Sequence, residues 1–181
     1  VRTGPGRFSP LKLAAGQDID LMLIRESTEG LFFSQGAGVV EENEARETLR
    51  ITRATSEKLF RFAFAQAAQR KAAGVGKGRV TCVDKANVFR AFAFFRGIFD
   101  EEAARHPDLT ADHAYVDAFS LWMVLKPWEY DVVVTENMFG DILSDLGAGL
   151  RGGLGLAPSA DIGDEHAVFQ PASDPHLRRP T

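Results

Sequence analysis

An apolar strand followed directly by a helix is the feature that most constrains the fold of this chain. The strand is predicted at Tyr130–Thr135 (YDVVVT), and the segment after it carries Asp141 and Asp145. The four-residue spacing places both aspartates on one face of a helix. Two such carboxylates repel unless a cation lies between them, and Mg²⁺ or Mn²⁺ prefers oxygen ligands. The alternative is an ordinary helix with one aspartate in its first turn and the other in solvent.

The rest of the chain continues this alternation of strand and helix. Apolar runs predict three further strands, at residues 19–24, 79–84 and 112–118. Helical patterns are found at residues 56–73, 88–106, 119–125 and 140–150. Such alternation favours an α/β architecture. Four side chains capable of chemistry then lie at predicted strand carboxyl ends, where open α/β sheets bind ligands; they are Arg25, Lys85, Asp117 and Asn137.

Two local features admit alternative interpretations. The Arg25 guanidinium suits bidentate binding of a substrate carboxylate, or an ordinary surface pair with Glu26 or Glu29. Fourteen phenylalanines are present, and many lie on the helices predicted at 56–73 and 88–106. They indicate either an oligomer interface made by helices or simply a large core. Ser56 is the expected N-cap of the first of these helices.

Three irregular segments interrupt this alternation of strands and helices. Residues 34–51 are polar and predict a hairpin that leaves the body, with strands at 39–40 and 49–51. Residues 74–78 are glycine-rich but lack the context of a phosphate loop, so we interpret them as a turn. Residues 147–152 match G-x-G-x-x-G but follow a helix, so we interpret them as a helix C-terminus and loop.

Composition argues against several classes of protein. The net charge of −4 disfavours nucleic acid as a partner. No apolar run is long enough to cross a bilayer, and no signal peptide is recognisable, so no membrane partner is expected. Cys82 is the single cysteine, which rules out an intrachain disulfide and fits a reducing compartment. We therefore expect a cytoplasmic protein.

Five motifs in register resemble one enzyme family. They are RESTEG at 25–30, VDKANV at 83–88, YVDA at 115–118, NMFGDILSD at 137–145 and GLGLAPSA at 153–160. In this order and spacing they resemble the β-decarboxylating hydroxyacid dehydrogenases. That family includes 3-isopropylmalate, isocitrate, homoisocitrate and tartrate/D-malate dehydrogenases. The resemblance extends to about Pro171.

The resemblance implies an NAD-dependent oxidative decarboxylation of a 2-hydroxy acid, with 3-isopropylmalate as first choice. Arg25 matches an arginine that binds the substrate carboxylate. Lys85 matches the lysine that assists deprotonation of the hydroxyl, and Asn87 matches a residue near the nicotinamide. Hydride leaves the alcohol carbon while a base takes the hydroxyl proton, and loss of CO₂ then develops an enolate.

The resemblance also implies a divalent cation, Mg²⁺ or Mn²⁺, which stabilises the enolate charge. Its carboxylate ligands match Asp117, Asp141 and Asp145. The family forms homodimers in which the neighbouring subunit supplies the residues that match Asp117 and Lys85. Residues 34–51 match the dimer arm, and the phenylalanine-rich helices match the intersubunit helical bundle.

The chain departs from the family pattern in three places. Phe32 stands where the family has a tyrosine that protonates the enol carbon, and phenylalanine has no proton to give. The family's other substrate arginines would precede residue 1. Residues 173–181 stand where the family has a histidine- and glycine-rich cofactor loop, which suggests a shifted reading frame or a truncation.

We therefore expect an isopropylmalate dehydrogenase-like α/β fold that comprises mainly the second domain. Residues 1–150 are predicted as the substrate, metal and dimerisation domain, with the arm at about 34–51. Residues 151–172 would begin the return into the cofactor domain, and 173–181 would be an aberrant or disordered tail. Such a chain is expected to be inactive alone; the alternative is a non-catalytic truncated module that dimerises or binds metal.

Overall fold

The structure is a computed structural model that describes residues 2–3, 9–14 and 17–171. The expected tail at 173–181 lies outside the described residues. The centre of the molecule is a five-stranded sheet in which the first strand is antiparallel and the other four are parallel. In sheet order its strands are β1 (Arg2–Thr3), β2 (Leu21–Arg25), β7 (Val132–Thr135), β5 (Arg79–Asp84) and β6 (Thr110–Tyr115). The predicted α/β class is confirmed.

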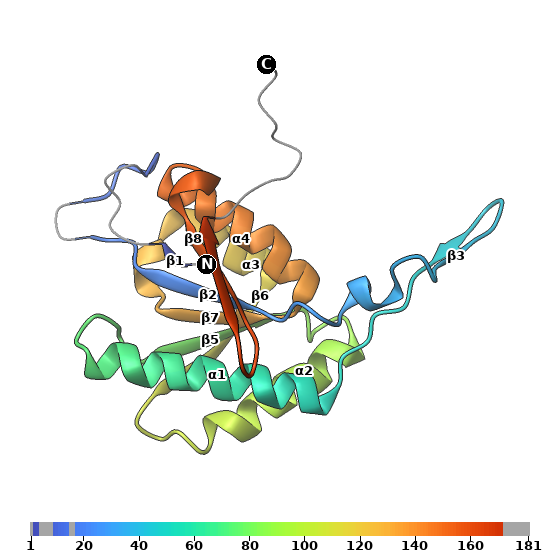
Figure 1. Ribbon diagram of the computed structural model, residues 1–181, viewed down its shortest axis with the longest axis horizontal. Coiled ribbons are helices and arrows are strands. Elements are labelled where there is room, and N and C mark those ends of the chain that lie inside the picture. Colours follow the sequence, from blue (N-terminus) through green and yellow to red (C-terminus); the bar gives the residue numbers. More distant parts are fainter. Residues whose placement is uncertain (1, 4–8, 15–16, 172–181) are drawn as a thin grey trace.

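Helices cover both faces of this sheet (Figure 1). One face packs against α1 (Arg53–Ala72) and α2 (Arg90–Ala103). The other packs against α3 (Val116–Leu125) and α4 (Asn137–Arg151). Short 3₁₀ helices lie at Leu31–Ser34, Pro127–Glu129 and Leu154–Leu156. Among the described residues, no helix is both long and apolar enough to cross a membrane.

Strand alternation divides the interior into two apolar clusters. Val132 and Val134 of β7 face the α1–α2 side, whereas Val133 faces the α3–α4 side. All three valines are fully buried, as expected of a central parallel strand. The sheet therefore holds the strand ends rigidly, which fixes the starting points of the loops that follow them.

Phenylalanine rings fill most of the space between α1 and α2. Phe60 lies with its ring centroid 4.7 Å from that of Phe95 and 5.3 Å from that of Phe99. These rings are fully buried, so the large-core interpretation accounts for them. Phe89 and Phe94 differ, because their side chains are about half exposed.

The polar segment after β2 forms the expected hairpin, which projects from the body (Figure 1). Its strands are β3 (Val39–Val40) and β4 (Ala45–Arg46), paired antiparallel. The prediction that the second strand lies at residues 49–51 is wrong, because this strand is Ala45–Arg46. A tight turn, in which the Glu41 amide donates to the Glu44 carbonyl at 2.8 Å, forces the chain to pair again already at Ala45.

Several predicted boundaries are also wrong. The strand expected to reach Ala118 ends at Tyr115, so Asp117 lies in the first turn of α3. Ser56 lies inside α1, where its hydroxyl donates to the Thr52 carbonyl at 2.7 Å, and Thr52 occupies the N-cap position. Helix α4 begins at Asn137 rather than Gly140, because the Glu136 carboxylate caps it.

The remaining glycine-rich segments behave as predicted. Residues 74–78 form a turn between α1 and β5. Helix α4 ends at Arg151, and Gly152 adopts a left-handed conformation with φ of 110° that favours glycine. Two further strands, β8 (Pro158–Ile162) and β9 (Ala167–Pro171), form an antiparallel ribbon.

Candidate active site

The predicted site residues lie along one edge of the sheet, at the carboxyl ends of its parallel strands. Register places Arg25 of β2 opposite Thr135 of β7, and Thr135 opposite Val83 of β5. Asp84 of β5 is in turn opposite Tyr115 of β6. The residues that follow these strands therefore emerge side by side, where open α/β sheets bind ligands.

Arg25 is held against the first turn of α4. Its Nε and Nη2 atoms donate to Asn137 Oδ1 at 2.9 and 2.7 Å, and Nη1 contacts Asp141. The surface pairing with Glu26 or Glu29 is not formed. Close approach requires Gly140, because a Cβ atom there would lie 2.5 Å from Arg25 Cγ.

Lys85 and Asp117 form a second cluster, which follows β5 and β6. The Lys85 ammonium contacts the Asp117 carboxylate and lies 5.9 Å from the centre of the Tyr115 ring. This contact holds the pKa of Asp117 below its ordinary value. The Asp117 side chain is 68% exposed.

The three candidate metal ligands do not converge within one chain. Asp141 and Asp145 are exposed on α4, whereas Asp117 lies on α3 beside Lys85. Among residues 2–3, 9–14 and 17–171, no group of three or more His, Cys, Asp or Glu side chains could hold a metal ion. Asn87 is exposed in the turn between β5 and α2.

Several buried carboxylates that organise this edge were missed from the sequence. Asp84 is fully buried and accepts from Arg96 Nε and Nη2 at 2.8 and 2.7 Å and from the Ala86 amide at 2.8 Å. Glu136 caps α4 by accepting from the Phe139 amide at 2.7 Å, and burial raises the pKa of its carboxyl. Capping preferences did not identify Glu136, because glutamate is not a preferred N-cap residue.

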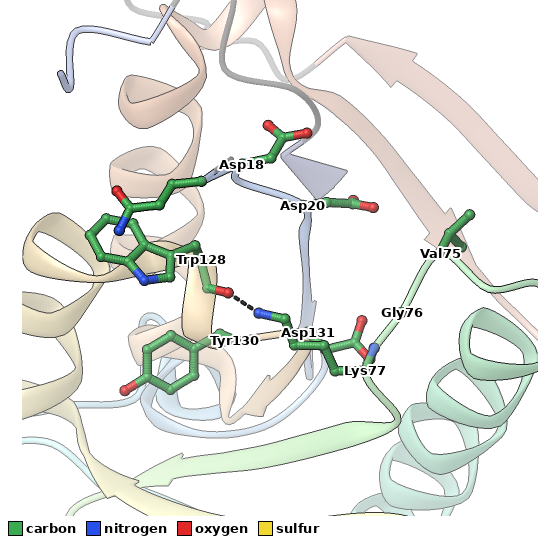
Figure 2. Close-up of a pocket in the computed structure, with 9 residues that line it drawn as sticks. Asp18, Asp20, Val75, Gly76, Lys77, Trp128, Tyr130 and Asp131 are labelled. Atoms are coloured by element: carbon green, nitrogen blue, oxygen red, sulfur yellow. Dashed lines mark hydrogen bonds between the residues drawn. The ribbon is translucent and has the colours of Figure 1, made fainter. Parts of the chain in front are cut away.

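A pocket of about 520 Å³ lies at the opposite edge of the sheet, near the strand amino ends (Figure 2). Its buried carboxylate belongs to Asp131 and is already satisfied within the chain. Arg70 Nε donates to it at 2.7 Å, and the amides of Lys77 and Gly78 donate at 2.7 and 2.8 Å. The pocket is thus lined by one member of a structural ion pair, Asp131, and does not contain the predicted site residues.

The parallel sheet and the polar residues at its strand ends define an open-sheet α/β protein. Within that class, the chain belongs to the isocitrate/isopropylmalate dehydrogenase family, whose model matches residues 3–174. It is therefore a dehydrogenase by family.

Curated relatives are similar over most of this chain. The 3-isopropylmalate/3-methylmalate dehydrogenase of Methanocaldococcus jannaschii is 48% identical over 155 residues, which are 85% of this chain and 46% of the relative. The 3-isopropylmalate dehydrogenase of Deinococcus radiodurans is 42% identical over 176 residues, with coverage of 94% and 47%. The chain spans about half the length of the curated relatives it matches.

Solved structures agree with this assignment. Isocitrate dehydrogenase from Methylococcus capsulatus superposes with a TM-score of 0.80 at 36% identity, over 95% of this chain and 50% of that one. The TT0538 protein of Thermus thermophilus gives 0.79 at 38% identity, over 96% and 33%. Because the two superpositions cover 95% and 96% of this chain, the similarity extends through the described fold.

Proposed function

We propose that this chain is the substrate, metal and dimerisation part of an NAD-dependent dehydrogenase that oxidatively decarboxylates a 2-hydroxy acid. The relatives named 3-isopropylmalate dehydrogenase favour 3-isopropylmalate as the substrate. The observation that carries the proposal is the Arg25 guanidinium, held at the end of β2 by Asn137 with Asp141 beside it. A fixed cation next to an accessible carboxylate suits a chelate of substrate and metal.

The residues present fit a hard divalent cation. Asp141 and Asp145 offer exposed oxygen ligands one helical turn apart on α4, which Mg²⁺ or Mn²⁺ prefers. Asp117 would join them from a second subunit. Such a cation, when bound, supplies Lewis-acid stabilisation of negative charge on the substrate oxygens.

The chain's own residues would bind the substrate and move its proton. Arg25 would neutralise and orient one carboxylate, while Asn87 would lie near the nicotinamide of NAD. Lys85 would take the hydroxyl proton as a general base. Lys85 contacts Asp117, so this contact would open before Lys85 reaches the substrate hydroxyl.

Phe32 cannot supply the proton that the enol carbon needs in the last step. Its ring is 44% exposed and lies 5.4 Å from Arg25 Cζ, so it borders the proposed substrate site. Water would then be the proton donor, and the final step is expected to be slow.

A homodimer would complete the site. Exposed apolar side chains on α3 and at the start of α2 support this partner, because such surfaces are typical of subunit contacts. They are Val88, Phe89, Phe94, Leu121, Val124 and Leu125, each at least 42% exposed. The single buried cysteine fits our proposal of a cytoplasmic location.

A chimera tests this function independently of what flanks the chain. Residues 9–171 would replace the matching segment of the Deinococcus radiodurans relative, and NADH formation from 3-isopropylmalate would be followed with Mn²⁺. We expect activity that disappears in Lys85→Ala, whereas the 181-residue chain alone shows none. A folded, dimeric chimera without activity would instead support the non-catalytic dimerising or metal-binding module.

A further inference from the structure

We propose that Asn137 is a positioning residue that fixes the orientation of the Arg25 guanidinium for bidentate capture of a substrate carboxylate. This inference rests on the proposed role of Arg25. Asn137 is 1% exposed and follows β7 by two residues, so it lies beside the end of β2. It bonds to Arg25 and is itself buried beneath the site.

Both halves of the Asn137 amide are engaged. Its oxygen accepts from Arg25 Nε and Nη2, while its Nδ2 donates to the Glu29 carbonyl at 2.9 Å. The reversed amide would place an NH₂ group against the guanidinium and the oxygen against a carbonyl, so both contacts would be lost. The amide orientation, and with it the plane of the guanidinium, is therefore set by the fold.

The Glu29 carbonyl is itself held rigidly. The Glu29 amide donates to the Glu26 carboxylate at 2.8 Å, and the Glu29 carboxylate accepts from the Thr52 amide and hydroxyl, each at 2.8 Å. Gly30 also pairs with Arg50. Asn137 thus connects Arg25 to a loop that is fastened at several points, which restricts motion of the guanidinium.

The remaining hydrogens of Arg25 are suitably placed for a ligand. A guanidinium carries one N–H on Nε and two on each Nη. Asn137 uses Nε–H and one hydrogen of Nη2, and Asp141 uses one hydrogen of Nη1. Within the described residues, one hydrogen on each Nη is left for the two oxygens of a carboxylate. Asn137 therefore occupies the Nε–Nη2 edge of the guanidinium, while Asp141 takes one hydrogen of Nη1.

The first test examines the ligand-free 181-residue chain by ¹⁵N NMR of the Arg25 Nε–H group. We expect slow solvent exchange of this hydrogen in the wild type and fast exchange in Asn137→Ala. Asn137→Asp retains an oxygen acceptor for Arg25 but cannot donate to Glu29, so it should retain slow exchange. Thr135→Val is the matched control, because it removes a buried hydrogen bond, to the Val83 carbonyl at 2.7 Å, in which Arg25 takes no part. Equal protection in the wild type and Asn137→Ala would overturn the proposal.

The second test titrates 3-isopropylmalate with Mg²⁺ into the same proteins by calorimetry. We expect affinity to fall on the order of tenfold in Asn137→Ala and no further loss when Asn137→Ala is added to Arg25→Gln. Additive losses would show a general structural effect and overturn positioning. If the wild type binds no hydroxyacid although Arg25 Nε–H is protected as described, the proposed substrate fails while the positioning role stands.

Discussion

The buried ion pair of Arg70 and Asp131 allows a quantitative prediction of stability. The Arg70 side chain is 6% exposed and the Asp131 side chain 1%, and their Nε–Oδ1 distance is 2.7 Å. Arg70→Met keeps most of the apolar stem but leaves the Asp131 charge buried. Removal of one partner from such a pair costs about 3–5 kcal/mol. The amides of Lys77 and Gly78 still donate to Asp131, so we expect the lower limit, about 3 kcal/mol.

Urea unfolding of the 181-residue chain at neutral pH, followed by circular dichroism, measures this free energy. A loss of about 3 kcal/mol corresponds to a decrease in Tm of about 6–12 °C for a domain of this size. Arg70→Met/Asp131→Asn removes the orphaned charge and should recover about half of the loss. Lys126→Met is the control, because its pair with Glu129 is exposed and should contribute no more than about 0.5 kcal/mol.

Two results would refute this reasoning. If Arg70→Met unfolds at the same urea concentration as Lys126→Met, the Arg70–Asp131 contact contributes no more than a surface pair. If the double variant is no more stable than Arg70→Met, the loss arises from packing around the arginine stem rather than from an uncompensated charge.

Four further predictions concern the site edge and the interface. Burial raises the pKa of Glu136, so the folded state favours the protonated carboxyl, and this contribution to stability is lost as pH rises through that pKa. The substitution Glu136→Gln should therefore increase the free energy of unfolding more at pH 7.5 than at pH 4. Phe32→Tyr should increase turnover of the chimera by supplying a proton donor, measured as kcat. Leu125→Glu should shift the chain from dimer to monomer in sedimentation, because a charge would enter the proposed interface. Gly140→Ala should destabilise α4 through its clash with Arg25, although Gly149→Ala in the same helix meets no atom within 4 Å and should stabilise it, as urea midpoints would show.

Local sequence predicted the strands and helices well where one type of signal dominated. The strand at Arg79–Asp84 has the predicted bounds, because a β-branched run follows a glycine turn. The start of α4 was missed because its cap is Glu136, whereas capping preferences direct attention to serine, threonine, asparagine and aspartate. The end of β6 was missed because the β-branched Val116 favours a strand and continues the run before it, whereas α3 already begins there.

The partners of the site residues were harder to predict than their positions. Strand ends placed Arg25, Lys85 and Asn137 at one edge, and the sheet register agrees with that placement. The sequence also suggested Glu26 and Glu29 as partners of Arg25 because they are close in sequence. Backbone amides and Thr52 bind those carboxylates instead, and Arg25 turns to Asn137, 112 residues away. Contacts of that separation depend on strand order, which no local pattern contains.

The order of strands also explains why one chain holds two separate clusters. Arg25 ends β2 and Asp141 follows β7, whereas Lys85 and Asp117 follow β5 and β6 on the other half of the sheet. Helix α3 begins at Val116, directly after β6, and carries Asp117 outward into solvent. A two-fold axis that brings the Lys85 cluster of one subunit to the Arg25 cluster of another would repeat the contact in reverse. One interface would then complete two sites, so dimerisation and catalysis would be lost together when that interface is broken.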